Sequence, residues 1–375
     1  MENGLPVVEV SGPSYERGCA HGEACREIIK QTSNEYFAFT REHSEELGLP
    51  VLTTERRLLL TNRCIPFAKE YAPELCEELR GIADGADIGF EDLFSFNCFL
   101  EIWDWMHPTF LTGTVAEGCS LCGCTAFAVA EPATSGGTFV GQNYDFPTLF
   151  EPAAMLLRIR GDESETLVFT YAGVLGCAGL GSGGVACVIN NLTPSDARSG
   201  VPYPFILRRI LAQERIGDSI DAVLGAHRAS GLDYVLGDMN GEVYALETSA
   251  TDYKVIHGFD GWIAHSNHYV TDPMRSYERR SVRERGHSIV RYNRMTKMVR
   301  GWCGTIDLAA TQSFLQDHVN WPASICRHEE RDNIDSYTST NAALIFDPVG
   351  GRAWAARGNP CVNPFAEYSI TEASE

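Results

Sequence analysis

The 375-residue chain lacks any long hydrophobic run. No stretch of about 18 residues is free of charged and polar side chains, so we expect no membrane span. The N-terminal segment has no basic start followed by an apolar stretch, and we expect no secretory signal. The C-terminal sequence "TEASE" carries no peroxisomal tripeptide. These absences predict a cytoplasmic protein.

Basic residues are scarce relative to acidic ones. Lys and Arg number 30 against 50 Asp and Glu, which gives a net charge of −20. Phosphate groups are bound by positive side chains, so we expect neither nucleic acid nor an anionic membrane as a partner. One segment, 275–300, holds nine Lys and Arg residues. We interpret this segment as a solvated helix face whose basic residues have Glu partners. The alternative is a site for the phosphates of coenzyme A.

The 13 cysteines show no disulfide framework, since their number is odd and their spacing irregular. Without a secretory signal, reduced thiols are expected. Three cysteines cluster at 119, 122 and 124, around the stretch "SLCGCTAFAV". A zinc site with His265 and His268 lacks a matching second pair, and a redox pair lacks a following helix. The interpretation of these residues as buried cysteines in a strand remains open. We expect no metal and no cofactor.

The first third of the sequence favours helices. Apolar residues recur at three-to-four spacing over 14–43, 53–87 and 89–106. Pro66 and Pro73 are expected breaks, and Gly81 and Gly85 are expected near helix ends.

After about residue 113 the pattern changes to short strands separated by turns. Strands are expected at 124–130 and 136–146, then at 156–161, 166–173, 184–191, 233–250, 254–269, 340–348 and 352–358. Asn240-Gly241 is a typical hairpin turn. Helices are expected at 202–230 and 275–300. With no internal repeat or linker, this order predicts an α+β layered domain with antiparallel sheets.

Cys124 lies where a helical segment gives way to a predicted hairpin. If the bond between Gly123 and Cys124 were cut, Cys124 would carry both a thiol and a free α-amine. An α-amine titrates near pKa ~7.7–8, so it could serve as general base for its own thiol. A glycine before the cysteine would ease the unusual backbone geometry of that cleavage.

The stretch "GCTAFAVAEPATSGGTFVGQNYDF" resembles the processing site of the acyl-coenzyme A:6-aminopenicillanic-acid (isopenicillin N) acyltransferase family. These are N-terminal-nucleophile (Ntn) hydrolases of peptidase group C45. Further segments resemble the family in the same order: "ERGCAHGEACREI", "ELRGIADGADIGFEDLFSFN", "GVACVINNL", "GVPYPFILRRIL", "HSNHY", "WPASICRHEE" and "TSTNAALIFDP".

The resemblance implies an αββα four-layer sandwich with two antiparallel sheets. It also implies a precursor that cuts itself into residues 1–123 and 124–375. The first product is a helical pro-segment and the second a catalytic chain, which stay together as one composite domain and a heterodimer.

The same resemblance suggests roles for individual residues. Cys124 is the expected nucleophile, with Cys119 as a competing cleavage site. Asn267 is expected to donate to the oxyanion, Asp145 to orient the Cys124 amine or support self-cleavage, and Ser249 to assist maturation. His265 and His268 are expected to pack or hydrogen-bond rather than bind a metal.

Four residues are candidates for the substrate pocket: Asn190, Tyr144, Phe146 and Tyr337. Tyr337 marks a departure from the penicillin-forming enzyme, which resembles this chain but has a basic residue at that place. The departure argues against penicillin chemistry.

The sequence therefore predicts a self-processing cysteine amidohydrolase or acyltransferase. Its expected substrates are small N-acyl or aminoacyl amides, or thioesters, converted through a thioester acyl-enzyme. The alternatives are an acyl-coenzyme A-dependent N-acyltransferase of the penicillin-forming type, an uncleaved scaffold without activity, and a zinc-stabilised binding protein.

Overall fold

Two β-sheets form the centre of the computed structural model, which describes residues 4–46, 49–106, 123–161, 164–280, 282–329 and 337–371. The first sheet has the order β1-β4-β5-β6-β7-β8-β9-β10 and the second β11-β2-β3-β12-β13-β14. The strands of the first sheet are β1 (Val7–Ser11), β4 (Ala154–Arg160), β5 (Glu165–Tyr171), β6 (Ala178–Gly181), β7 (Val185–Asn191), β8 (Leu232–Asp238), β9 (Val243–Thr248) and β10 (Tyr253–His257). Those of the second are β2 (Thr125–Val129), β3 (Phe139–Pro147), β11 (Trp262–His265), β12 (Thr338–Asp347), β13 (Arg352–Arg357) and β14 (Ala366–Ser369).

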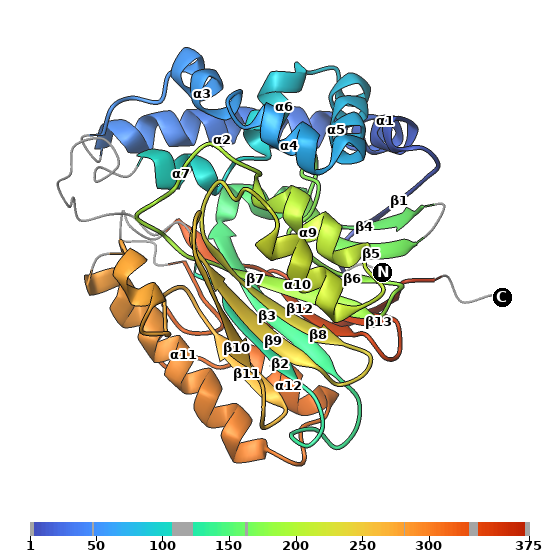
Figure 1. Ribbon diagram of the computed structural model, residues 1–375, viewed down its shortest axis with the longest axis vertical. Coiled ribbons are helices and arrows are strands. Elements are labelled where there is room, and N and C mark those ends of the chain that lie inside the picture. The colour runs from blue at the N-terminus through green and yellow to red at the C-terminus, as the bar shows by residue number, and fades with distance from the viewer. Residues whose placement is uncertain are drawn as a thin grey trace.

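The two sheets face each other, with β2 and β3 packed against β7 and β8. Helices cover the outer faces (Figure 1). Helices α9 (Tyr203–Leu211) and α10 (Ile216–Leu224) pack on the first sheet, and α11 (Val282–Trp302) and α12 (Leu308–Leu315) pack on the second. This is the expected αββα sandwich. The ladders are antiparallel except that β1 runs parallel to β4.

The N-terminal helices lie together at the top of Figure 1. They are α1 (Ser14–Ala24), α2 (Arg26–Glu46), α3 (Thr54–Thr61), α4 (Ile65–Tyr71), α5 (Pro73–Ala86), α6 (Phe90–Phe96) and α7 (Glu101–Met106). Pro66 and Pro73 each lie in the first turn of a helix, as a missing N–H allows. The helix expected over 89–106 is instead two helices, α6 and α7. The side chain of Asn97, at the end of α6, hydrogen-bonds Gly173 O and Leu175 N of a neighbouring segment.

Both glycines, Gly81 and Gly85, are buried in α5; Gly85 lies in the last turn, as expected, while Gly81 lies about a turn further inside the helix. Their role is the contact with α1. A Cβ on Gly81 would lie 2.1 Å from Tyr15 O, and one on Gly18 would lie 2.0 Å from Glu78 O. The missing side chains let the two backbones approach closely, so that α1 packs tightly against α5.

The hairpin of β8 and β9 turns at Asn240-Gly241, where Gly241 has φ of +87°. The predicted turn is therefore confirmed, and its reason is the positive φ that glycine tolerates. Strands β1, β6 and β14 were not anticipated. The strand β1 was missed because the sequence around it was interpreted as the start of a helical third.

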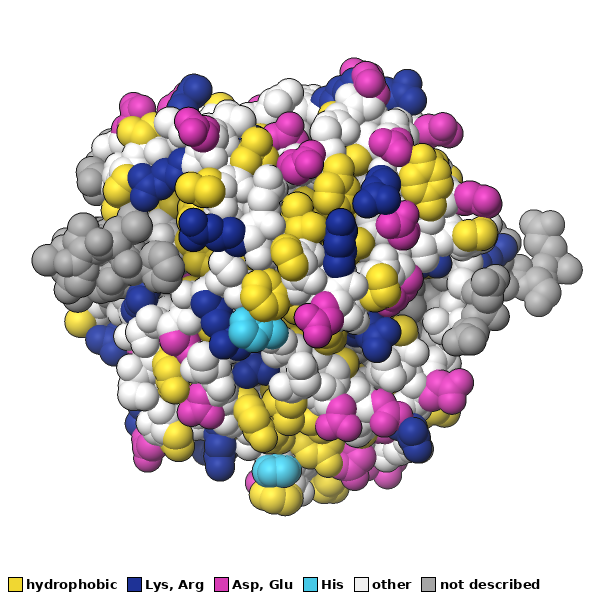
Figure 2. All heavy atoms as spheres, turned by 45° about the horizontal axis from the view of Figure 1, so that its top comes forward, with side chains coloured by type: hydrophobic (Ala, Val, Ile, Leu, Met, Phe, Trp, Pro, Cys, Tyr) yellow, Lys and Arg dark blue, Asp and Glu magenta, His cyan; other side chains and the backbone are white. Residues whose placement is uncertain are grey.

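Acidic and basic side chains are interspersed with apolar ones on the face shown in Figure 2. Within the described ranges, no helix is both long enough and apolar enough to cross a membrane.

Candidate active site

Cys124 lies immediately before β2, and its side chain belongs to the apolar layer between the two sheets, where it is 3% exposed. Burial raises the pKa of the Cys124 thiol to about 12, and the nearby Asp145 carboxylate adds to the rise. A thiol with such a pKa is protonated at neutral pH. Its use as a nucleophile therefore requires a base in direct reach.

Gly123 is held closely on two sides. Its backbone N–H donates to Asp145 O over 3.3 Å. A Cβ at this position would lie 2.8 Å from Arg327 Nη1 and 3.1 Å from Asp145 Oδ2. Only glycine fits here without a shift of these neighbours, and the carboxylate and the guanidinium therefore flank the segment that leads into the Gly123–Cys124 bond.

Asp145 comes from β3 and is fully buried. Its Oδ1 accepts a 2.7 Å hydrogen bond from Thr340 Oγ1, while Oδ2 has no hydrogen-bond partner among the described residues. Burial raises the pKa of the Asp145 carboxyl to about 7, although the positive charges of Arg291 and Arg327 oppose the rise. The carboxyl can therefore exchange a proton near neutral pH, or hold a cation, close to Gly123.

Asn267 follows β11, whose register with β2 pairs His265 with Ala126. The ladder ends at that pair, and Asn267 lies two residues beyond it, in a bend. The amide orientation is fixed, because Oδ1 accepts a 2.7 Å hydrogen bond from Arg291 Nη2 and Nδ2 donates to Asn191 O over 3.2 Å. An amide nitrogen carries two hydrogens, so the second is left for another acceptor.

Arg291 of α11 was not singled out by the sequence. It is 2% exposed, and its Nε also donates to Thr125 Oγ1 over 3.1 Å. Burial lowers the pKa of the Arg291 guanidinium to about 10, so it remains a cation at neutral pH. The interpretation of 275–300 as a solvated helix face was therefore wrong for Arg291 and for Arg280, which is 7% exposed. Contacts that cross from a helix to a distant strand leave no local signal in the sequence.

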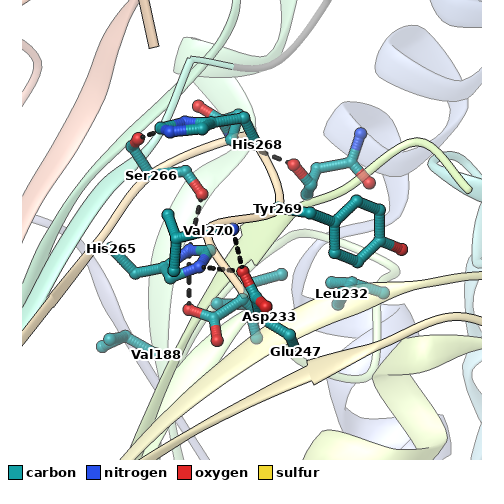
Figure 3. Close-up of polar contacts among 12 residues, drawn as sticks. Val188, Leu232, Asp233, Glu247, His265, Ser266, His268, Tyr269 and Val270 are labelled. Carbon is teal, nitrogen blue, oxygen red and sulfur yellow. Dashed lines mark hydrogen bonds and ion pairs between the residues drawn. The ribbon is translucent and has the colours of Figure 1, made fainter. Parts of the chain in front are cut away.

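His265 joins the two sheets through a buried cluster with Asp233 and Glu247 (Figure 3). Its Nδ1 lies 3.1 Å from Asp233 Oδ2 and its Nε2 lies 2.9 Å from Glu247 Oε1. Burial alone would lower the pKa of His265, but the two carboxylates outweigh it and raise the pKa to about 9. The resulting imidazolium connects β11 to β8 and β9 and so fixes the strand that leads into Asn267.

His268 hydrogen-bonds through Nδ1 to Ser288 Oγ over 2.8 Å, and burial lowers its pKa to about 3. It is therefore neutral. Both histidines make hydrogen bonds to protein groups, as expected. Cys119 and Cys122, which were considered as metal ligands with them, lie outside the described residues.

Tyr144 and Phe146 of β3 are buried in an aromatic cluster between the sheets and the N-terminal helices. The hydroxyl of Tyr144 lies 3.3 Å from that of Tyr203. Asn190 of β7 is also buried, and neither polar atom of its side chain has a hydrogen-bond partner within the described residues. An unpartnered buried amide suits a binding surface, because it can gain hydrogen bonds from a ligand.

Two of the residues predicted for the site, Tyr337 and Ser249, make their contacts in other parts of the fold. Tyr337 is 37% exposed and packs against Phe39 and His43 of α2. Ser249 follows β9 and donates to Asp196 Oδ2 over 2.8 Å, while its Oγ accepts from Asp252 N over 2.9 Å. These contacts are those of a turn, and none joins Ser249 to Cys124 in the described part of the chain.

Arg327, beside Gly123, is the second site residue that the sequence analysis missed. Its backbone is fixed by Thr340, which donates to Arg327 O through its backbone N over 3.0 Å and accepts from Arg327 N through Oγ1 over 3.0 Å. Arg327 lies within the segment "WPASICRHEE", where nothing local in the sequence distinguishes it from arginines of the surface.

A cavity of about 710 Å³ lies away from Cys124, among α2, α3 and the start of α6. Its lining includes Lys30, Arg41, Arg57 and Asp92. It contains none of the predicted site residues.

Residues 133–361 match the family model described as acyl-coenzyme A:6-aminopenicillanic acid acyl-transferase. The chain belongs to this family. The matched residues include Asp145, Asn267 and Arg327 but begin after Cys124, so the assignment of the nucleophile depends on the geometry at Gly123 and Cys124.

Several individual proteins are similar to this chain. The chain is 28% identical over 369 residues to the 40 kDa form of acyl-coenzyme A:6-aminopenicillanic-acid-acyltransferase of Emericella nidulans, covering 97% of this chain and 95% of that protein. It is 25% identical over 262 residues to a beta-alanyl-dopamine/carcinine hydrolase of Drosophila melanogaster, covering 65% of this chain and 64% of that protein. The solved structure of penicillin V acylase from Agrobacterium tumefaciens has 10% identity and a TM-score of 0.44, covering 66% of this chain and 86% of the other. The chain is thus a member of an acyltransferase family.

Proposed function

We propose that this protein cuts itself between Gly123 and Cys124 and then acts as an N-terminal cysteine amidohydrolase or acyltransferase. The observation that supports this most directly is the environment of Gly123, which lies between Asp145 and Arg327 immediately before a buried cysteine. A simple strand cysteine would need neither the crowded glycine nor the two charged groups.

Self-cleavage begins with attack of Cys124 Sγ on the carbonyl carbon of Gly123. The C–N bond breaks, the nitrogen takes the thiol proton, and residues 1–123 become a thioester on Cys124. Water then hydrolyses the thioester, which leaves a carboxylate on Gly123 and a free amine and thiol on Cys124. Strand β1 of the first product remains in the same sheet as β4 of the second, and this supports an associated heterodimer.

The freed amine then serves as the base that the buried thiol requires. It takes the thiol proton, the thiolate attacks the carbonyl carbon of the substrate, and a tetrahedral oxyanion forms. The Asn267 amide, fixed by Arg291, donates to this oxyanion. Asp145 Oδ2 holds the protonated amine in place. The amine then returns its proton to the leaving nitrogen, and a thioester acyl-enzyme remains.

Water or an amine completes the cycle by attacking the thioester, so hydrolysis and acyl transfer share one intermediate. The substrates we propose are small N-acyl and aminoacyl amides. The Drosophila relative, named for hydrolysis of a β-alanyl amine, favours aminoacyl amides, and the Emericella relative favours acyl-thioester donors as a second group. Asn190 and Tyr144, buried in the layer between the sheets, are the residues we propose for the acyl pocket. No contact supports the pocket role of Tyr337 or the processing role of Ser249.

The test is intact mass spectrometry of purified protein with activity assays on β-alanyl amines, N-acyl amides and acyl thioesters. The wild type is expected to yield fragments 1–123 and 124–375 and to turn over at least one of these substrates. Cys124→Ala is expected to stay whole and inactive. Cys187→Ala, which truncates another fully buried cysteine, is the matched control and should be cleaved and active. A wild type that is active with its chain whole would refute the proposal.

A further inference from the structure

Four potential metal ligands converge on one point beside the second sheet. His318, Cys326 and His328 lie between α12 and β12, and Cys361 lies between β13 and β14. Their ligand atoms all lie within 4.8 Å of one another. The sequence pattern does not predict this cluster, because its four members do not form the paired Cys-x-x-Cys or His-x-x-x-His spacing of common zinc motifs.

Nε2 of His328 lies at the centre of these contacts. It is 3.3 Å from His318 Nε2, 3.5 Å from Cys326 Sγ and 3.4 Å from Cys361 Sγ. An imidazole nitrogen carries either one proton or one lone pair, so it cannot form three hydrogen bonds of this kind at once. A cation at the common centre would instead bind all four atoms.

The separations of His328 Nε2 from the other three ligand atoms fit a tetrahedral zinc site. Zinc binds sulfur at about 2.3 Å and imidazole nitrogen at about 2.0–2.1 Å. In a tetrahedron these lengths separate two nitrogens by about 3.3 Å and a nitrogen from a sulfur by about 3.6 Å. The contacts of His328 differ from these values by about 0.2 Å or less.

We propose that His318, Cys326, His328 and Cys361 bind a zinc ion. Two thiolates and two imidazoles are a ligand set that selects zinc over magnesium or calcium. With four protein ligands no coordination position is left for water, so the ion is structural rather than catalytic. His318 is exposed and gives the ion a path from solvent. The ion ties the loop after α12 to the loop after β13.

The neighbouring contacts extend this support toward the active site. Asn359 donates through Nδ2 to Cys326 Sγ over 3.6 Å and to Arg327 O over 2.6 Å. Arg327 stands between two of the ligands in the sequence, and its guanidinium lies against Gly123. The zinc ion therefore also fixes Arg327 next to the bond that we propose to be cleaved; this part of the inference depends on the proposed function.

The experiment measures the zinc content of the purified protein. The protein carries no affinity tag, is expressed in cells grown with added zinc, and is dialysed against metal-free buffer. We expect about one equivalent of zinc per chain in the wild type. We expect little zinc in Cys361→Ser and in His318→Asn, the second of which changes an exposed residue. Cys303→Ser removes an exposed cysteine outside the cluster and should keep its zinc.

A spectroscopic measurement checks the ligands themselves. Cobalt replacing zinc in the wild type should show the visible bands of a tetrahedral site with thiolate ligands, and these bands should be weaker in Cys326→Ser, which keeps at most the Cys361 thiolate. Wild-type protein without zinc, or with equal zinc in Cys361→Ser and His318→Asn, would overturn the proposal. A disulfide between Cys326 and Cys361 in freshly purified protein would do the same.

The proposed effect of the zinc ion on self-cleavage is measured separately from zinc content. The fraction of chain cleaved should fall in His318→Asn relative to Cys303→Ser, and added zinc should not restore it. Equal cleavage in the two variants would overturn the link to Arg327. Zinc content is measured whether or not the chain is cut, so failure of the zinc site and failure of the proposed self-cleavage are distinguishable.

Discussion

Replacing Gly123 by alanine tests the geometry of the proposed cleavage site. The new Cβ would lie 2.8 Å from Arg327 Nη1 and 3.1 Å from Asp145 Oδ2. Ordinary contact is about 3.5 Å, so the neighbours would have to retreat by roughly 0.4–0.7 Å. Displacement of about 1 Å in a reacting arrangement can cost ~10²-fold in rate. We therefore expect Gly123→Ala to be processed about 10- to 100-fold more slowly than the wild type.

The assay follows the appearance of fragments 1–123 and 124–375 on denaturing gels after cell-free synthesis of the precursor. The matched control is Gly301→Ala in α11, where a Cβ meets no atom within 4 Å among the described residues. This control should be processed at the wild-type rate. Processing of Gly123→Ala at the wild-type rate would refute the idea that Asp145 and Arg327 act on the bond from these positions. A matching delay in Gly301→Ala would point to folding instead.

Two further substitutions test other parts of the site. Asn267→Asp keeps the shape but removes the amide donor, and we expect kcat to fall about 10²–10³-fold with little change in KM; a loss below tenfold would exclude Asn267 as the main oxyanion donor. His265→Gln removes the imidazolium between Asp233 and Glu247. Because the folded-state pKa of His265, about 9, lies above its ordinary value of 6.5, the wild type gains stability that is fully present below pH 6.5 and is lost as the pH rises through 9. We expect an advantage of about 3 kcal/mol for the wild type at low pH, measured by urea unfolding from pH 6 to 10; an advantage that grows with pH would contradict the assignment.

The buried cluster of His265, Asp233 and Glu247 also shows how stability and the site are connected. Burial raises the pKa of the Asp233 carboxyl to about 7, while His265 opposes the rise. For Glu247 the contacts with His265 and Thr271 outweigh burial and lower the pKa. The cluster holds β11 against β8 and β9, and Asn267 lies two residues after the end of β11. A change in this cluster should therefore alter the position of Asn267 as well as the stability of the sheets.

Several features of the fold were predictable because their causes are local. The hairpin turn at Asn240-Gly241 depends on a dipeptide that accepts positive φ, and the strands after Cys124 depend on apolar residues between turn residues. The break at Pro73 depends on a missing N–H. In contrast, the roles of Gly81 and Gly85 depend on α1, which lies some 60 residues earlier in the chain. In the sequence the two glycines indicate only a nearby helix end, and Gly85 does lie in the last turn of α5.

The sequence by itself determined the layered α+β class, the family resemblance and the choice of Gly123, Cys124, Asp145 and Asn267, because each is carried by a short motif or by a repeating pattern. Only the tertiary structure decided what surrounds them. Arg291 reaches Asn267 from a helix, Arg327 reaches Gly123 from a loop, and the four metal ligands meet from two separate loops. The physical reason is that these contacts join distant segments, and the packing of the sheets and helices, rather than any local spacing, brings them within reach of one another.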